Sequence, residues 1–350
     1  MTASDLSVLG IEVPVGSIDG ELRKLWEADE ASTNASLMNF AVYSEDPDSL
    51  AENSEIIRQL TREHACRAIL IAMDRKAPEP EIHSWITAHC NLAHGQKSVC
   101  CEQLSFLLRG YAAGRLRNTV FSHLSSDLPL VFWWQGELSR VFENRLYGSI
   151  DRFIIDSANW ADPREGFARI EEAVAETGDR LVVQDLAWTR TYHYRLAVAA
   201  LFDGLVAQRC LGQLGKVVIT ARRSDRISAI LLLAWLATQA KWNLVGTSGD
   251  RYQFESAEGA TVEASCGWTD GGAPVSRCEL AGPEFALRVT REDGSNQLKQ
   301  ILKCPEHTLE RSGPADAFES AGLVADQLSR GGTNALYRKV WPALFALLEA

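Results

Sequence analysis

This 350-residue sequence lacks the short motifs that most directly identify nucleotide-binding and hydrolytic proteins. It contains no Gly-x4-Gly-Lys-Ser/Thr run for cradling phosphates, no Gly-x-Gly-x-x-Gly turn for a dinucleotide and no Gly-x-Ser-x-Gly nucleophile elbow. The nearest stretches are too short or lack a required glycine: Gly95-Gln-Lys-Ser98, Gly212-Gln-Leu-Gly215 and Gly246-Thr-Ser-Gly249. The sequence therefore predicts none of these three kinds of site, and we expect no bound cofactor.

Positive charge and long apolar segments are also scarce. Lysine and arginine number 35 against 46 acidic residues, a net charge of -11, whereas binding to nucleic acid or to an anionic membrane needs a basic surface. The longest apolar run, Ile227 to Ala237, is interrupted by Ser228 and is about half the length that crosses a bilayer. The first 20 residues contain no Lys or Arg, unlike a secretory signal. We therefore expect a cytoplasmic protein with neither nucleic-acid nor membrane partners.

The cysteines show no Cys-x-x-Cys spacing. In a cytoplasmic chain of this size we expect them to be free, buried thiols that pack as small apolar side chains. The alternative is a reversible disulfide in the region of predicted hairpins that holds Cys266, Cys278 and Cys304. The eight cysteines are Cys66, Cys90, Cys100, Cys101, Cys210, Cys266, Cys278 and Cys304.

A group of metal-ligating residue types lies between residues 83 and 101. Residues 82–108 alternate apolar and polar side chains around a turn at His94-Gly95-Gln96, which predicts a β-hairpin. The alternation places His89 and Cys90 on opposite faces of one strand, so they cannot bind one ion together. We therefore expect no metal site. The group consists of His83, His89, Cys90, His94, Cys100 and Cys101.

Outside this hairpin, short apolar runs alternate with helical patterns, which is typical of α/β proteins with a largely parallel sheet. Strands are predicted at 37–43, 67–73, 128–135, 151–155, 180–184 and 216–220. Helices are predicted at 46–62, 110–124, 138–147 and 162–177, around Tyr194 to Leu205, and around Ile227 to Trp235. Two closing helices are also predicted, the last with Leu336, Val340, Leu344 and Leu347 in one stripe.

The chain as a whole is predicted to have two α/β parts. An N-terminal arm at 1–35 precedes an N-terminal α/β domain at 36–177 and a C-terminal α/β domain at 178–350. Alternating apolar residues separated by Gly and Asp turns predict an antiparallel meander at about 243–303 in the C-terminal domain.

Polar and aromatic residues follow four of the predicted strands. If these strands share one sheet, the residues meet along one edge, outside the carboxyl ends of the strands, where α/β proteins bind ligands. We call this group the arginine rim. It comprises Trp133, Trp134 and Gln135; Asp156, Ser157 and Trp160; Asp185, Trp188 and Arg190; and Arg222, Arg223, Ser224 and Asp225.

Two interpretations of the arginine rim remain open. Ser224 or Asp225 would cap the following helix, so that Arg222 and Arg223 stand beside helix N–H groups in an arrangement suited to an anion. In the other interpretation the tryptophans belong to the core, and the arginines form structural ion pairs with Asp156 and Asp185.

Two stretches of the sequence resemble one protein family. Asp127-Leu-Pro-Leu-Val-Phe-Trp-Trp134 is similar to the Leu-Pro-x-x-x-Trp-Trp signature of the glucose-6-phosphate dehydrogenase assembly proteins, OpcA. Asp185-Leu-x-Trp188-Thr-Arg190, followed by Arg195 and Leu201-Phe-Asp203, resembles the second signature of that family. The chain departs from the family where it carries His193-Tyr194 in place of Pro-Trp.

The resemblance implies a bacterial, non-catalytic assembly factor and allosteric activator of glucose-6-phosphate dehydrogenase. Such a protein binds and stabilises the active oligomer of that enzyme in the oxidative pentose phosphate pathway. The resemblance to photosynthetic members of the family also implies thioredoxin as a partner. The resemblance further implies that interface or interface-supporting residues are Trp133, Trp134, Trp188, Arg190 and Arg195.

The residues alone allow an alternative of a different class. An enzyme or sensor that binds a sugar phosphate would use Arg190, Arg222 and Arg223 on the phosphate. Asp156 or Asp185 would then accept hydrogen bonds from the sugar hydroxyls.

Overall fold

The computed structural model describes residues 7–28, 33–34, 36–93, 96–110, 116–178, 180–202, 211–305 and 307–349. The chain forms two compact units. The N-terminal unit comprises Met1–Ile155 and Arg169–Gln184, and the C-terminal unit comprises Asp156–Ala168 and Asp185–Ala350. The domain boundary that the sequence predicts, between residues 177 and 178, stays a prediction, because compact units need not coincide with domains.

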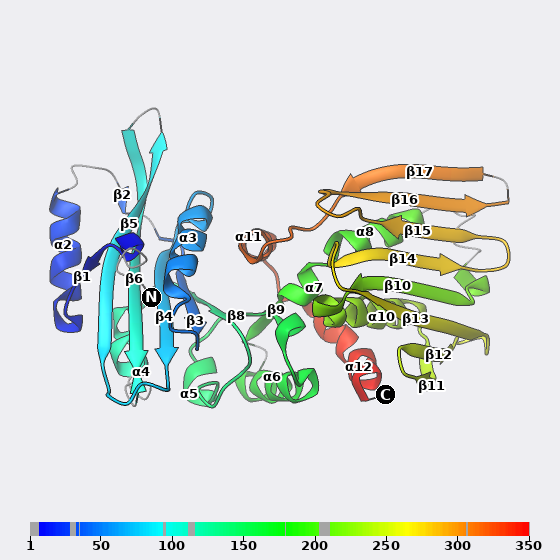
Figure 1. Cartoon of the computed structure of the whole chain (residues 1–350), viewed down its shortest axis with the longest axis horizontal. Coiled ribbons are helices and arrows are strands. Elements are labelled where there is room, and N and C mark those ends of the chain that lie inside the picture. Colours follow the sequence, from blue (N-terminus) through cyan, green and yellow to red (C-terminus); the bar gives the residue numbers. More distant parts are fainter. Residues whose placement is uncertain are drawn as a thin grey trace. The chain divides into compact units, whose positions relative to one another are not determined.

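The N-terminal unit is built on a mixed sheet with the strand order β1-β5-β6-β4-β3-β7-β8-β9, and β2 pairs with β6 (Figure 1). Strands β3, β4, β7 and β8 run parallel, and β6 is parallel to β4 and antiparallel to β5. The strands are β1 (Ile11–Glu12), β2 (Thr33–Asn34), β3 (Asn39–Ser44), β4 (Arg67–Asp74), β5 (Ile82–Ala93), β6 (Gln96–Arg109), β7 (Leu130–Trp134), β8 (Arg152–Ile155) and β9 (Val182–Asp185).

The core of this sheet confirms the sequence patterns. Every residue of β3 and β7 is buried, as expected for parallel strands that are covered on both faces. The predicted hairpin is also present as β5 and β6, although two residues of its turn, His94 and Gly95, lie outside the described residues. The predicted α/β class is therefore confirmed.

Cys90 and Cys100 form a disulfide across this hairpin, which corrects the expectation that all cysteines are free. The two residues lie directly opposite each other on β5 and β6, with their Cα atoms 4.0 Å apart. Strand pairing therefore brings their side chains together. No group of three or more metal-ligating residues forms a site among the described residues, and His94 lies outside them.

Two predicted helices are shorter than the sequence indicates. Only Leu116–Thr119 (α4) is helical within the described part of 110–124, and a 3-10 turn follows it. In the segment 138–147, only Asn144–Tyr147 (α5) is helical. The Arg169 guanidinium donates hydrogen bonds to the backbone carbonyl oxygens of Leu138, Ser139 and Phe142. These carbonyls therefore have the guanidinium as their partner in place of helix N–H groups.

The described residues of this part of the chain also form the helices α2, α3 and α6. Helix α2 (Ile18–Ala28) lies within the predicted arm, and helix α3 (Leu50–Leu60) buries Ile57 and Leu60 as the sequence predicts. Helix α6 (Pro163–Thr177) follows β8 and passes from the C-terminal unit into the N-terminal unit at residues 168 and 169.

The C-terminal unit contains a second sheet with the order β11-β12-β13-β10-β14-β15-β16-β17 (Figure 1). Neighbouring strands are antiparallel except for the parallel pair β10 and β13. The strands are β10 (Lys216–Arg222), β11 (Asn243–Ser248), β12 (Arg251–Glu255), β13 (Thr261–Thr269), β14 (Val275–Ala281), β15 (Ala286–Thr290), β16 (Gln297–Cys304) and β17 (His307–Pro314).

Strand β10 is the main correction to the predicted topology. The arginine rim assumes that it shares one sheet with β7, β8 and β9, but β10 lies at the centre of the second sheet, between β13 and β14. Its residues alternate between buried, such as Val217 and Ile219, and exposed or half-buried. That pattern fits a sheet covered by helices on one face only.

Five helices lie entirely within the described part of the C-terminal unit. Helix α10 is buried from Ile227 to Ala237 and packs against β10 and α12, which explains why it is apolar on all sides. In α12, Leu336 is 43% exposed and Tyr337 is buried, so the predicted stripe is wrong at that position. No described helix is long and apolar enough to span a membrane. The helices are α7 (Leu186–Thr189), α8 (Tyr192–Leu201), α10 (Arg226–Ala240), α11 (Ser320–Arg330) and α12 (Ala335–Glu349).

Candidate functional site

Asp185 lies at the centre of a buried hydrogen-bond network in the C-terminal unit. It ends β9 and caps α7, where its carboxylate accepts a hydrogen bond from the Ala187 N–H at 2.9 Å. The same carboxylate accepts hydrogen bonds from the Ser157 N–H at 3.1 Å, the Ser157 hydroxyl at 2.6 Å and the Tyr337 hydroxyl at 2.8 Å. Burial, together with the charge of Asp156, raises the pKa of Asp185 to about 6.

Arg190 forms a two-pronged ion pair with Asp156. Its two terminal nitrogens donate to the two carboxylate oxygens of Asp156 at 2.7 and 2.6 Å, and its Nε lies 3.4 Å from Asp225. The side chains of Arg190 and Asp156 are only 9% and 10% exposed. Burial alone would lower the pKa of Arg190, but the hydrogen bonds and charge of Asp156 outweigh it, and the pKa is raised. Arg190 is therefore held in place by buried carboxylates.

The turn after β10 completes this cluster and corrects a predicted cap. Asp225 immediately precedes α10, yet its carboxylate makes no capping hydrogen bond to that helix. It accepts hydrogen bonds from Arg222 Nε at 2.7 Å and from the Ser224 hydroxyl at 3.0 Å. Arg223 points elsewhere: its side chain is 69% exposed and its Nε lies 3.7 Å from Asp270.

Trp188 and Arg195 form a second cluster in the same unit. The Arg195 guanidinium carbon lies 3.4 Å from the centre of the Trp188 ring, and Arg195 donates hydrogen bonds to the Trp188 carbonyl and the Thr191 hydroxyl. Burial lowers the pKa of Arg195 to about 9. The centre of the Tyr192 ring lies 6.0 Å from the Arg195 guanidinium carbon and 3.7 Å from that of Arg330. These cation–π contacts orient α8 on α7.

Trp133 and Trp134 belong to the N-terminal unit, on β7, and both are core residues. They are 2% and 0% exposed. Trp134 packs on Tyr43 at 4.2 Å between ring centres and donates a hydrogen bond to the Glu137 carbonyl. The Trp133 N–H has no hydrogen-bond partner among the described residues. Their predicted contribution to an interface stays a prediction, and it would act through the shape of the core.

Residues far away in the sequence contact helix α8 next to the second cluster. His193 donates its N–H to Asp316 at 3.0 Å and contacts the same carboxylate through Nδ1 at 2.8 Å. Tyr194 donates its hydroxyl to the Val275 carbonyl at 2.7 Å and is buried. The residues that replace the family's Pro-Trp therefore hold α8 in the unit. Nothing in the sequence pattern around Asp316 indicates this contact.

The three cysteines predicted as a redox group lie on separate strands. Cys266 and Cys278 both pair with Ile219, on opposite sides of β10, which places them two strand spacings, about 10 Å, apart. That separation exceeds the reach of a disulfide. Burial raises the pKa of both thiols to about 12. Cys304 ends β16 opposite His307. A redox role for these cysteines stays a prediction.

Comparison with known proteins identifies the family. A family model described as the glucose-6-phosphate dehydrogenase subunit N-terminal domain, OpcA, matches residues 57–172, and one described as the C-terminal domain of that subunit matches residues 181–341. A protein of Nostoc punctiforme, whose name assigns it to the OxPP cycle as OpcA, is 27% identical over 77% of this chain. The match spans 58% of that relative, less than two thirds of its length.

Solved structures of oxidoreductases are similar to this chain at low identity. A mutant of KijD10, a 3-ketoreductase from Actinomadura kijaniata in complex with TDP-benzene and NADP, has a TM-score of 0.50 and 12% identity, covering 89% of this chain and 96% of that one. An aldose-aldose oxidoreductase from Caulobacter crescentus has a TM-score of 0.49 and 13% identity, covering 89% and 97%. The two family models together cover most of the chain, which therefore belongs to the glucose-6-phosphate dehydrogenase assembly protein family, OpcA.

Proposed function

We propose that this protein is a non-catalytic assembly factor and allosteric activator of glucose-6-phosphate dehydrogenase in the oxidative pentose phosphate pathway. It binds the dehydrogenase and stabilises its active oligomer. The observation that carries the proposal is the match of both halves of the chain to the two domains of the OpcA family. A cytoplasmic location and thioredoxin as a further partner stay predictions.

The geometry of the signature residues supports a structural contribution to binding. Arg190 is paired with Asp156, and Arg195 is stacked on Trp188, so these side chains are engaged inside the unit. Residues held in this way fix the backbone of the segment that follows β9. We infer that they support the shape of an interface, in which other, exposed residues touch the dehydrogenase.

The proposal is tested by titrating purified glucose-6-phosphate dehydrogenase from the same organism with this protein while following NADPH production. Saturable activation is expected, together with a heavier complex by light scattering. An unrelated acidic protein at equal concentration is the control for non-specific stabilisation. No activation and no complex, with both proteins folded, would refute the proposal.

The sugar-phosphate alternative depends on the two arginines that remain accessible. The side chains of Arg222 and Arg223 are 37% and 69% exposed, although each lies beside a carboxylate, Asp225 or Asp270. Replacing both arginines with alanine should leave activation of the dehydrogenase largely intact. Calorimetry measures whether sugar phosphates bind to the wild type and to this variant. Binding to the wild type that is lost in the variant would favour the alternative.

A further inference from the structure

The C-terminal sheet has one face that none of the described helices covers. Helices α8 and α10 pack on the other face, and α12 packs on α10 (Figure 1). The strands show the same division, since Val217, Ile219 and Ala221 of β10 are buried while Lys216 is exposed. We call the side that carries Lys216 the open face.

The open face is basic in a protein that is acidic as a whole. The strand registers place Glu263 and Glu279 on the same side of the sheet as Lys216, together with the basic residues Arg251, Arg277, Arg288 and Lys303. The alternation along β16 places Lys299 on this side as well. Six basic residues face five glutamates there, one of which, Glu292, follows β15 and pairs with Lys299, so the face has an excess of one positive charge, whereas the chain carries -11. The basic residues are Lys216, Arg251, Arg277, Arg288, Lys299 and Lys303, and the glutamates are Glu255, Glu263, Glu279, Glu292 and Glu310.

Three of these cations are available to a partner. Arg277 and Arg288 both pair with Glu279, and Lys299 pairs with Glu292. Three others have no carboxylate within 4.0 Å among the described residues: Lys216, Arg251 and Lys303. Free cations on a surface can form ion pairs with a partner without first breaking pairs of their own.

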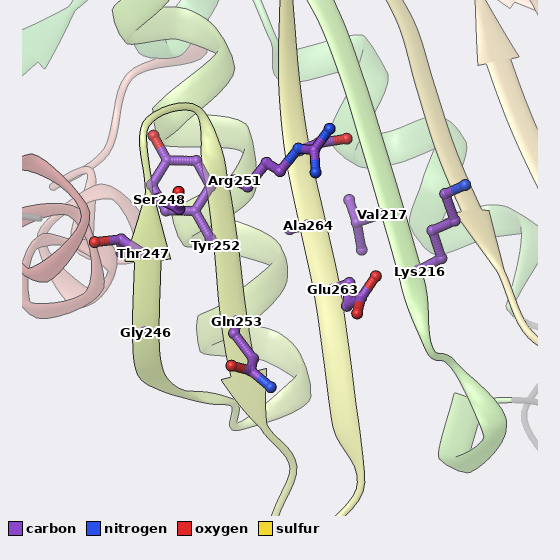
Figure 2. A pocket seen from close by; sticks show the side chains of 11 residues that line it. Lys216, Val217, Gly246, Thr247, Ser248, Arg251, Tyr252, Gln253, Glu263 and Ala264 are labelled. Atoms are coloured by element: carbon purple, nitrogen blue, oxygen red, sulfur yellow. The ribbon is translucent and has the colours of Figure 1, made fainter.

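Two hollows in the surface of the open face adjoin at Lys216. A hollow of about 580 Å³ lies over β10 to β13 and is lined by Lys216, Arg251 and Glu263 (Figure 2). A second hollow of about 340 Å³ lies over β10 and β14 to β16 and is lined by Lys216, Arg288 and Lys303. The two hollows therefore share Lys216 and place the three available cations at positions where side chains of a partner can enter.

The open face is also large enough for a specific interface. Eight strands spaced about 4.8 Å apart, each five to nine residues long at about 3.3 Å per residue, give roughly 800 Å². A stable protein–protein interface covers about 800 Å² on each partner. One sheet face thus supplies an area of that size.

We propose that the open face docks an acidic surface of glucose-6-phosphate dehydrogenase; this inference rests on the function proposed above. Charge complementarity favours that occupant over a second copy, because two open faces would bring like charge excesses together. The net charge of -11 opposes nucleic acid. Salt screens the distant acidic residues beyond about 8 Å, so the local positive charge governs docking.

The test reverses the three available cations together, as Lys216→Glu, Arg251→Glu and Lys303→Glu. A matched control reverses three exposed cations elsewhere, Arg23→Glu, Arg145→Glu and Lys339→Glu, which also have no carboxylate within 4.0 Å among the described residues. Both triple variants carry the same net charge. The concentration that half-activates the dehydrogenase should rise at least tenfold for the open-face variant and less than twofold for the control.

The outcomes separate this inference from the proposed function. A wild type that neither activates nor binds the dehydrogenase refutes the proposed function. The docking surface is refuted if the wild type is functional and the open-face variant gives the same titration. It is also refuted if the wild type is functional and both triple variants are equally impaired. A homodimer of the isolated protein that only the open-face variant dissociates would assign the face to a second copy and overturn the inference.

Alanine variants guard against an effect of folding. Lys216→Ala, Arg251→Ala and Lys303→Ala remove charge without introducing repulsion, and each is expected to raise the half-activating concentration about twofold to threefold. Circular dichroism and thermal melting must match the wild type in each case. The salt dependence of binding should also become shallower in these variants, because fewer ion pairs form across the interface. Folded alanine variants with unchanged titrations would refute the docking surface.

Discussion

Asp156→Asn should unfold the protein more readily than its small change in shape implies. Asparagine has nearly the same size as aspartate, so no cavity forms. The change removes the negative charge that pairs with Arg190, whose side chain is 9% exposed. The Arg190 guanidinium is then left in a buried site with Asp225, at 3.4 Å, as the nearest remaining carboxylate.

The magnitude follows from burial of the pair. Removing one partner of a buried ion pair typically costs about 3–5 kcal/mol, because the remaining charge stays desolvated. Asp225 still offsets part of that penalty, so we expect a loss of about 3 kcal/mol in the free energy of unfolding. Asp270→Asn is the matched control, because it removes the partner of Arg223 in a pair that is 69% and 98% exposed. Such surface pairs contribute about 0–1 kcal/mol.

The assay is equilibrium unfolding in urea at pH 7, followed by far-ultraviolet circular dichroism and tryptophan fluorescence. Coincident transitions from the two probes establish that a single free energy is meaningful. The reasoning would be refuted by an Asp156→Asn variant that loses less than 1 kcal/mol, as the control should. That result would mean that water reaches the Arg190 pair.

Two further predictions concern the disulfide and pH. Reduction of Cys90–Cys100, which closes a loop with a sequence separation of 10, should lower the free energy of unfolding by about 3 kcal/mol. Thermal melting with and without reductant measures this loss of stability. If reduction leaves the number of thiols counted in denaturant unchanged, the disulfide is absent and the prediction is contradicted. The raised pKa of Asp185, about 6 against 3.8, means that the folded state binds its proton more tightly. Protonated Asp185 therefore contributes about 3 kcal/mol to the free energy of unfolding, which is fully present below pH 3.8 and is lost as the pH rises through 6. The free energy of unfolding of the wild type, minus that of Asp185→Asn, should fall across that range of pH. A difference that does not change with pH would contradict the prediction.

The sequence predicts those parts of the fold that local pattern determines. Strands β3, β4 and β7 are short, largely apolar runs, and β5 largely alternates apolar and polar residues before the turn of the β5–β6 hairpin, so these elements can be recognised within a few residues. The position of β10 cannot be recognised in this way. Its sheet is decided by β13 and β14, which come later in the chain, and a strand of five to seven residues fits either kind of sheet.

The candidate site shows the same limit. Asp156, Asp185 and Arg190 are identified from their positions after strands, and they do come together. Their partners come from distant segments: Tyr337 lies 152 residues after Asp185, and Asp316 lies 123 residues after His193. Contacts at such separations depend on the packing of whole helices, which periodicity within one segment does not specify.

The path of the chain between the two units has a consequence for biosynthesis. The N-terminal unit needs residues 169–184, which emerge from the ribosome after residues 156–168 of the other unit. Its sheet therefore stays without β9 until that stretch has been synthesised. A fragment that ends at Ile155 would expose the edge of β8, and a fragment that begins at Asp185 would leave Arg190 without Asp156. Gene fusions or truncations that separate the halves by a single cut should therefore yield poorly folded products, even though each half matches its own family model.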